Sequence, residues 1–134
     1  MNADEHGYKH EELTGKIIKT FYDVYNELGY GFLEAAYEKA MVIALRAAGM
    51  QAEPQKAIEV WFRGDRVGEF AADIVVESLV LLELKAARAL DPSHEAQLLN
   101  YLRATNVEVG LLLNFGPKPQ IKRFVFDNDR KRQR

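Results

Sequence analysis

The chain of 134 residues contains no cysteine. It also lacks long apolar segments, which further limits the classes of protein to which it can belong. Without thiols the protein has neither disulfides nor thiolate metal sites, which is compatible with a reducing compartment. The longest apolar run, residues 79–84, is far shorter than the roughly 20 residues of a membrane helix, and Glu83 interrupts it. The polar residues 2–5 lack the apolar stretch of a signal peptide. We therefore expect a soluble, cytoplasmic protein.

A strong excess of charge of either sign is also lacking. The formal net charge is −2 at pH 7, so overall charge does not indicate a nucleic-acid-binding protein. The one basic cluster lies in residues 130–134. We expect a solvated, disordered tail there, and weak steering of a polyanion is the alternative.

The hydrophobic pattern predicts one α/β domain. Apolar residues at spacings of three and four predict helices over residues 13–28, 32–48 and 92–104. Alternating or continuous apolar segments predict strands over residues 57–63, 67–76, 79–85, 106–114 and 121–126. The first three strands should form an antiparallel meander, and a right-handed crossover through the third helix should add a parallel pair. We expect a lead-in over residues 1–12, the domain over 13–127 and a basic tail over 128–134.

Three charged residues interrupt two of the predicted strands. Asp73 lies in one strand, and Glu83 and Lys85 lie in the next. Alternation places Glu83 and Lys85 on one face, roughly 6.6 Å apart, and a hairpin would bring Asp73 close to Glu83. Two neighbouring carboxylates repel unless a cation lies between them, and oxygen ligands without thiols favour Mg²⁺ or Mn²⁺. The alternative is a surface hairpin whose acids face water, with Lys85 in an exposed ion pair.

An acid and a polar cluster on the predicted helices extend this pattern. Glu34 shares a helix face with Tyr37, so it is either a further metal ligand or an acid favoured in the first turn. His94, Gln97 and Tyr101 share a face of the third helix. Gln97 and Tyr101 are suited to binding phosphate oxygens or orienting a lysine, and His94 to donating a hydrogen bond. The alternative is the polar stripe of an amphipathic helix.

These motifs together resemble the PD-(D/E)xK nuclease superfamily. Asp73 and the Glu83-Leu84-Lys85 triplet match its acidic pair and lysine, although Ala72 stands where the family pattern has proline. Gln97 and Tyr101 match the Gln-x-x-x-Tyr motif of the RecB-like branch. Residues 31–37, GFLEAAY, look like the signature of the small bacterial GxxExxY proteins assigned to this superfamily.

The resemblance implies a restriction-endonuclease-like core, a mixed β-sheet flanked by helices in the order α-α-β-β-β-α-β-β. It implies a Mg²⁺- or Mn²⁺-dependent nuclease acting on nucleic acid, most simply DNA. Asp73, Glu83 and Lys85 would be catalytic. Asp73, Glu83, the Leu84 carbonyl and Glu34 would hold the metal. The residues implied for substrate binding are Gln97, Tyr101, Tyr37 and His94.

Two other interpretations remain open. One is a non-catalytic module that keeps the nuclease fold as a platform for nucleic acid or protein. The other is activity only as a homodimer or beside a partner, since one small domain offers little surface for a duplex.

Overall fold

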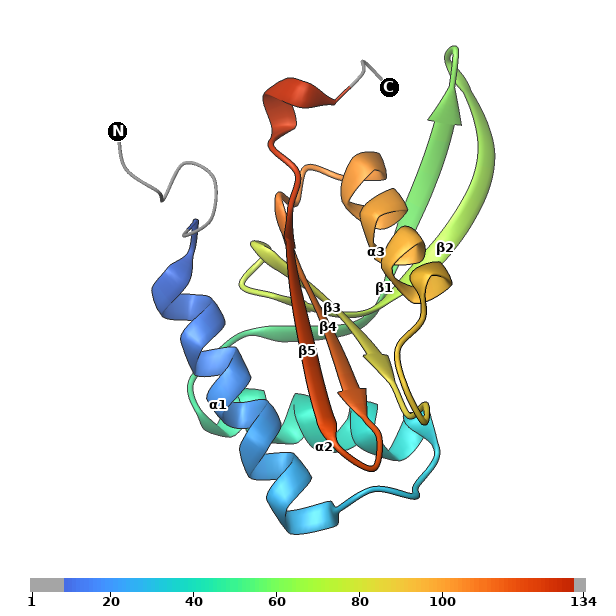
Figure 1. The fold of residues 1–134 in the computed structure, drawn as a ribbon. Helices are drawn as coiled ribbons and strands as arrows, with labels where there is room; N and C mark the ends of the chain where they lie inside the picture. Colours follow the sequence, from blue (N-terminus) through green and yellow to red (C-terminus); the bar gives the residue numbers. More distant parts are fainter. Residues whose placement is uncertain (1–8, 132–134) are drawn as a thin grey trace.

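A computed structural model describes residues 9–131 and shows the predicted order of helices and strands (Figure 1). The first part of the chain contains α1 (Glu11–Leu28), α2 (Glu34–Ala47), β1 (Ala52–Phe62), β2 (Asp65–Val76) and β3 (Val80–Lys85). Then follow α3 (Pro92–Ala104), β4 (Val109–Phe115), β5 (Pro119–Val125) and the 3-10 helix η2 (Asn128–Arg130). The predicted α/β class and element order are confirmed.

The strands form one mixed sheet in the order β1-β2-β3-β4-β5. Strands β3 and β4 are parallel and are connected through α3, whereas the other neighbouring strands are antiparallel. The predicted meander and parallel pair are therefore both present. The pairing of β2 with β3 is short, from Ile74 opposite Leu82 to Val76 opposite Val80.

Strands β1 and β2 extend beyond the other strands as an arm, residues 57–71 (Figure 1). Within the described chain these residues pair only with each other. The tip turns at Arg63 and Gly64, whose φ angles are 51° and 87°. Positive φ at both central residues is the geometry of a tight two-residue hairpin.

The two faces of the sheet carry separate cores. Leu82 and Leu84 belong to the core under α1 and α2, whereas Leu81 belongs to a second core under α3. Side chains alternate along a strand, so Glu83 and Lys85 lie on the α3 side with Leu81. The sheet therefore directs the two charged residues of β3 towards α3.

The strands begin one to five residues from the predicted positions. Strand β4 begins at Val109, where the sequence predicted residue 106. Two of the other differences involve proline. Strand β1 begins at Ala52 and includes Pro54, whereas the sequence predicted a start at residue 57. Strand β5 begins at Pro119, which the sequence placed in a loop. Both are edge strands, where a residue without a backbone N–H costs no ladder hydrogen bond.

The ends of the described chain pack against the domain. Helix α1 begins at Glu11, inside the expected lead-in, and the Lys9 amine contacts Glu108 and Asp127 at 3.2 and 3.0 Å. The Lys131 amine donates to the carbonyl oxygens of Thr105 and Val107 at 2.9 and 2.8 Å. The disorder expected for the basic cluster, residues 130–134, is therefore not found at residues 130 and 131. The rest of the lead-in, 1–8, and of the tail, 132–134, lie outside the described residues.

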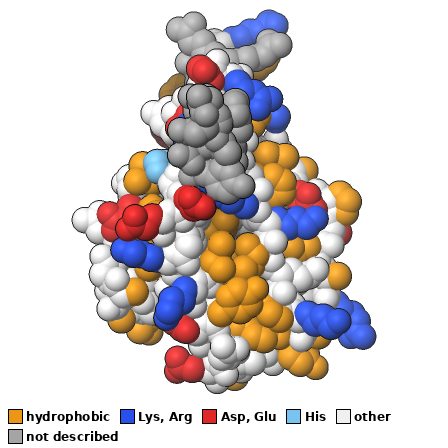
Figure 2. Space-filling model, turned by 60° about the vertical axis from the view of Figure 1, so that its left-hand side comes forward, with side chains coloured by type: hydrophobic (Ala, Val, Ile, Leu, Met, Phe, Trp, Pro, Cys, Tyr) orange, Lys and Arg blue, Asp and Glu red, His pale blue; other side chains and the backbone are white. Residues whose placement is uncertain are grey.

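The surface carries hydrophobic side chains in two regions. Figure 2 shows a band of them on the side of the molecule where α1 lies, with charged side chains around it. Large exposed residues of α1, α2 and their connection include Tyr22, Phe32 and Ile43, and the second set lies on β1 and β2. Over residues 9–131, none of the helices has the length and apolar character to span a membrane.

Two glycines should respond to alanine with opposite signs. A Cβ at Gly116 would lie 2.4 Å from the Ala87 carbonyl oxygen, whereas a Cβ at Gly15 in α1 would meet nothing within 4 Å. We expect Gly116→Ala to lower the free energy of unfolding by roughly 1–3 kcal/mol through overpacking. Gly15→Ala should raise it by about 0.5–1 kcal/mol. Urea unfolding measures both, and equal midpoints for Gly116→Ala and wild type would contradict the described contact.

Candidate active site

Asp73 and Glu83 lie where β2 and β3 separate. The paired register ends at Ile74 and Leu82, and the two acids are the next residues along their strands. The Glu83 carboxylate accepts from the Asp73 backbone N–H at 3.2 Å, and the Asp73 carboxylate accepts from the Leu84 backbone N–H at 2.7 Å. The two side chains thus bridge the strands at the point where their pairing ends. The predicted proximity of the two acids is found.

The two carboxylates share a poorly solvated space. Glu83 is only 3% exposed, and Asp73 is partly buried. Burial, and then the neighbouring Asp73 charge, raise the pKa of Glu83 from its usual 4.5 to about 8. Burial is also the main cause that raises the pKa of Asp73, while the hydrogen bond from Leu84 opposes it. The positive charge near Asp73 and Glu83 is therefore too small to keep both carboxyl groups ionised.

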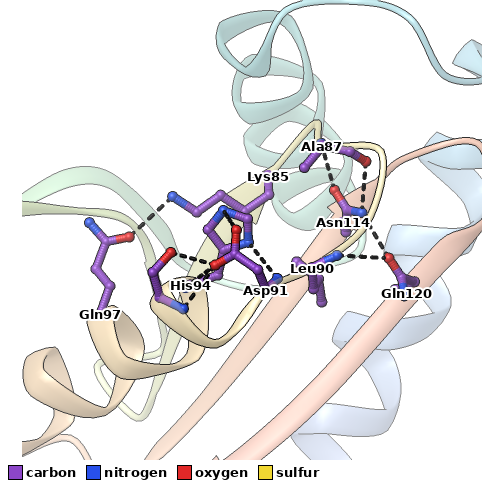
Figure 3. Close-up of polar contacts among 9 residues, drawn as sticks. Lys85, Ala87, Leu90, Asp91, His94, Gln97, Asn114 and Gln120 are labelled. Atoms are coloured by element: carbon purple, nitrogen blue, oxygen red, sulfur yellow. Dashed lines mark hydrogen bonds and ion pairs between the residues drawn. The ribbon is translucent and has the colours of Figure 1, made fainter.

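Lys85 begins a polar chain that leads to α3. Its amine donates to Gln97 Oε1 at 3.1 Å, and Gln97 Nε2 lies 3.1 Å from the Tyr101 hydroxyl (Figure 3 shows the Lys85–Gln97 contact). Its charge also lowers the pKa of both Asp73 and Glu83. Gln97 and Tyr101 are one helical turn apart and face the same site, as predicted. The neutral amide holds the lysine without removing its charge.

A buried amide fixes the loop between Lys85 and α3 (Figure 3). Asn114 of β4 is fully buried, and its side chain accepts from the Ala87 N–H at 2.9 Å and donates to the Ala87 carbonyl at 3.0 Å. It also donates to Gln120 Oε1 at 3.0 Å, which accepts from the Leu90 N–H at 3.3 Å. Neither residue was predicted from the sequence, because the partner of an amide in a strand is determined only by the fold. Asn114 and Gln120 thus fix the position of α3 relative to Lys85.

His94 points towards the start of its own helix. Its Nδ1 accepts from the Asp91 backbone N–H at 3.2 Å, and Asp91 Oδ1 accepts from the His94 backbone N–H at 3.4 Å (Figure 3). This reciprocal arrangement is a capping box. Although His94 shares a helix face with Gln97, the structure gives its ring a capping role and does not join it to the Lys85 chain.

The acids of α2 lie near the pair without completing a ligand cluster. Glu34, in the first turn, is exposed, and Glu38 is one turn further. The charges of both raise the pKa of Asp73, that of Glu38 the more. The sequence analysis did not consider Glu38; its place one helical turn from Glu34 was the available signal. No group of three acidic, histidine or cysteine residues with metal-binding geometry occurs within residues 9–131.

Tyr37 is part of the core. It is fully buried, and its ring stacks on Phe115 with centroids 4.1 Å apart. Its hydroxyl donates to the Gly29 carbonyl at 2.6 Å and accepts from the Phe32 N–H at 3.3 Å. These bonds fix the connection that leads into Glu34. In this structure Tyr37 has no surface with which to touch a substrate.

The donor set of the acidic pair fits a divalent metal ion. Each carboxylate uses one oxygen for a backbone N–H and can accept a second partner with the other. Two carboxylates in a space of low polarity, with further acids near them, favour a cation between them. All available ligands are oxygens, which Mg²⁺ and Mn²⁺ prefer. Asp73 and Glu83 are therefore suited to hold such an ion.

Comparison with known proteins identifies the class. The family model described as the PD-(D/E)XK nuclease superfamily matches residues 11–124, and the chain belongs to this superfamily. Its fold is similar to the crystal structure of SSO0001, with a TM-score of 0.57 and 19% identity, covering 69% of this chain and 50% of that one. The chain thus spans half the length of SSO0001. None of the curated proteins matches the chain in sequence.

These findings confirm the restriction-endonuclease-like fold predicted from the sequence. Members of the superfamily are generally nucleases that use divalent metals such as Mg²⁺ or Mn²⁺. The Asp73–Glu83 pair and Lys85 lie together on one face of the sheet, which agrees with that chemistry.

Without metal, the stability of the protein should depend on pH through Glu83. Between about pH 4.5 and 8 the folded protein keeps the Glu83 proton, and the unfolded chain releases it. The folded state binds more protons in this window, so its stability falls as pH rises. In EDTA, we expect wild type to lose roughly 1 kcal/mol per pH unit relative to Glu83→Gln across this window.

Urea unfolding from pH 5 to pH 8 measures this difference. The control variant is Glu12→Gln, because Glu12 is an exposed acid of α1. It should follow the wild-type pH profile. Parallel profiles for wild type and Glu83→Gln would show that burial does not protonate Glu83.

Proposed function

We propose that this protein is a Mg²⁺- or Mn²⁺-dependent nuclease that hydrolyses phosphodiester bonds of nucleic acid, most simply DNA. The observation that carries the proposal is the acidic pair Asp73 and Glu83, joined at the point where two strands separate, with Lys85 on the same face. Within the superfamily we assign the chain to the GxxExxY group of the RecB-like branch. The support is the motif of Gly31, Glu34 and Tyr37 and the pair of Gln97 and Tyr101.

Asp73, Glu83 and the Leu84 carbonyl would hold the metal, with Glu34 acting through a bound water. The exposed position of Glu34 and its effect on the pKa of Asp73 support a water-mediated role. When bound, the ion supplies positive charge that stabilises the phosphoryl oxygens in the transition state. Binding requires Glu83 to lose its proton, because only the carboxylate is a ligand.

Lys85 would orient the attacking water and stabilise the negative charge that develops on the phosphate. Gln97 accepts only one of the three amine hydrogens, so the others remain able to contact water and a phosphate oxygen. Tyr101, bonded to Gln97, keeps the amide oriented and presents its ring beside the site. As water attacks phosphorus, the new P–O bond forms, the opposite P–O bond breaks, the water releases one proton to solvent, and the leaving oxygen takes one proton from solvent. His94 stays a weaker proposal, because its ring already caps α3.

A non-catalytic module is the second candidate. It is favoured by the lack of a three-residue ligand cluster within residues 9–131 and by the raised pKa of Glu83. If Glu83 stays protonated, a hydrogen bond takes the place of the metal ion. The fold would then serve only to bind nucleic acid or protein. A homodimer is compatible with both candidates and would add contact surface for a duplex.

Cleavage assays test the catalytic proposal. Single- and double-stranded DNA and RNA are incubated with Mg²⁺ or Mn²⁺, and products are resolved on a denaturing gel. We expect Lys85→Ala and Asp73→Ala each to reduce the rate by about 100-fold or more, because they remove charge stabilisation and a metal ligand. Lys19→Ala is the control, since Lys19 on α1 is 78% exposed. Equal rates in wild type, Lys85→Ala and Asp73→Ala would discard the mechanism.

Thermal unfolding separates the two candidates without a substrate. A metal that binds only the folded protein raises the unfolding temperature. We expect Mn²⁺ to raise it for wild type and for Asp23→Asn, a change at an exposed acid of α1. Asp73→Asn should abolish the shift. No shift at millimolar Mn²⁺ in wild type would favour the non-catalytic module.

A further inference from the structure

A cavity adjoins the Lys85 side of the site, between the arm of β1 and β2, helix α3 and the C-terminal segment. Its volume is about 730 Å³, and Gln97 and Tyr101 belong to its lining. The same two residues connect to the Lys85 amine, so the cavity and the proposed active site share a wall. A molecule that fills the cavity therefore contacts the two residues that lead to the Lys85 amine.

The walls of this cavity are rich in aromatic rings. Five of its lining residues are aromatic, namely Trp61, Phe62, Phe70, Tyr101 and Phe126. Trp61, Phe62 and Phe70 on the arm are 43%, 58% and 49% exposed. Phe70 and Tyr101 face each other across the inner end, with ring centroids 5.7 Å apart. Exposed rings gain free energy only when another flat apolar surface covers them.

Positive charge is concentrated at the same place. Four lining residues are basic, namely Arg63, Arg103, Arg130 and Lys131, and none of the described lining residues is acidic. Three of these cations converge on the Phe126 ring, with Arg103 and Arg130 at 5.2 Å and Lys131 at 5.9 Å from its centroid. In a chain of net charge −2, this cluster is a local exception. Its chemistry is complementary to a polyanion.

We propose that this cavity binds single-stranded nucleic acid, with bases stacked on the arm and phosphates held near Phe126, and directs the strand to the Lys85 site. The proposal rests on the nuclease function proposed above and specifies its substrate. A duplex hides the faces of its bases, so an aromatic wall offers it little, whereas a single strand exposes those faces. The described lining has four basic residues and no acidic one. A protein partner would not require such an excess of positive charge.

The chain contains a built-in probe of this cavity. Trp61 is its only tryptophan, so intrinsic tryptophan fluorescence reports on the arm alone. Base stacking should quench it. The experiment titrates Lys85→Ala, which keeps the metal ligands and lacks the catalytic amine, with a thymidine oligonucleotide and with a duplex of equal length. Each titration is made in Mg²⁺ and in EDTA. We expect quenching that saturates with the single strand, and about tenfold weaker binding of the duplex.

Variants on the same background assign the binding to the two walls. With a labelled oligonucleotide and fluorescence anisotropy, Trp61→Ala should weaken binding about tenfold or more, and Trp61→Phe should retain most of it. Arg130→Ala should lower the slope of log K against log salt by about 0.7, the value for one phosphate contact in a single strand. Ile43→Ala and Lys19→Ala, at exposed positions of α2 and α1, are the matched controls and should bind as the parent does.

Three results would overturn the proposal: no binding of the single strand, equal or tighter binding of the duplex, or equal binding by Trp61→Ala and Trp61→Phe. Sedimentation completes the test. A dimer that dissociates in Trp61→Ala without a change in oligonucleotide affinity would make the arm a contact between copies and would also overturn it. Binding that depends on Trp61 in a protein without cleavage activity would reject the nuclease mechanism and keep the cavity assignment. Cleavage of single strands that is unaffected by Trp61→Ala would reject the cavity assignment and keep the nuclease mechanism.

Discussion

The exchange of hydrogen bonds between Asp73 and Glu83 is the interaction on which the candidate site depends. Where β2 and β3 separate, the two carboxylates accept the backbone N–H groups of Asp73 and Leu84 and so bridge the two strands. An unpaired buried N–H would cost about 1–3 kcal/mol. The acids therefore stabilise the opening between the strands, and the opening holds the acids close together. The two residues of the proposed metal site thus also stabilise the fold at this point.

The other parts of the site follow from the alternation along β3 and from the crossover. Leu82 and Leu84 pack towards α1 and α2, so Glu83 and Lys85 must face α3. The crossover then returns over this face and presents Gln97 to the Lys85 amine. Asn114, fixed in the neighbouring parallel strand, ties down the loop that connects the two. A short stretch of chain thus carries most of the polar chemistry.

The sequence allowed the core of the site to be predicted because the signals were local. Asp73, Glu83 and Lys85 interrupt apolar strands, and Gln97 and Tyr101 are one helical turn apart, so their relative places follow from the geometry of strands and helices. Tyr37 was different. Its hydroxyl pairs with the connection between α1 and α2, and such a bond leaves no mark in the spacing of residues. Pro54 hid the start of β1, since only the sheet order reveals an edge strand. The aromatic and basic residues of the cavity come from segments far apart in the chain and meet only in the fold.

The arm has a mechanical consequence for the molecule. Its residues, 57–71, form a ribbon of two strands, and no third strand in the described part of the chain pairs with it. Ile58 and Phe70 anchor its base against α3, whereas a two-stranded ribbon without such packing is marginally stable. The sheet below it is held on both faces by packed helices. Bending should therefore be concentrated towards the tip of the ribbon, where it would change the width of the cavity more than the spacing of the carboxylate pair. The molecule combines a deformable cavity wall with an acidic pair that is fixed in the sheet, so molecules of different width would meet the same arrangement of Asp73 and Glu83.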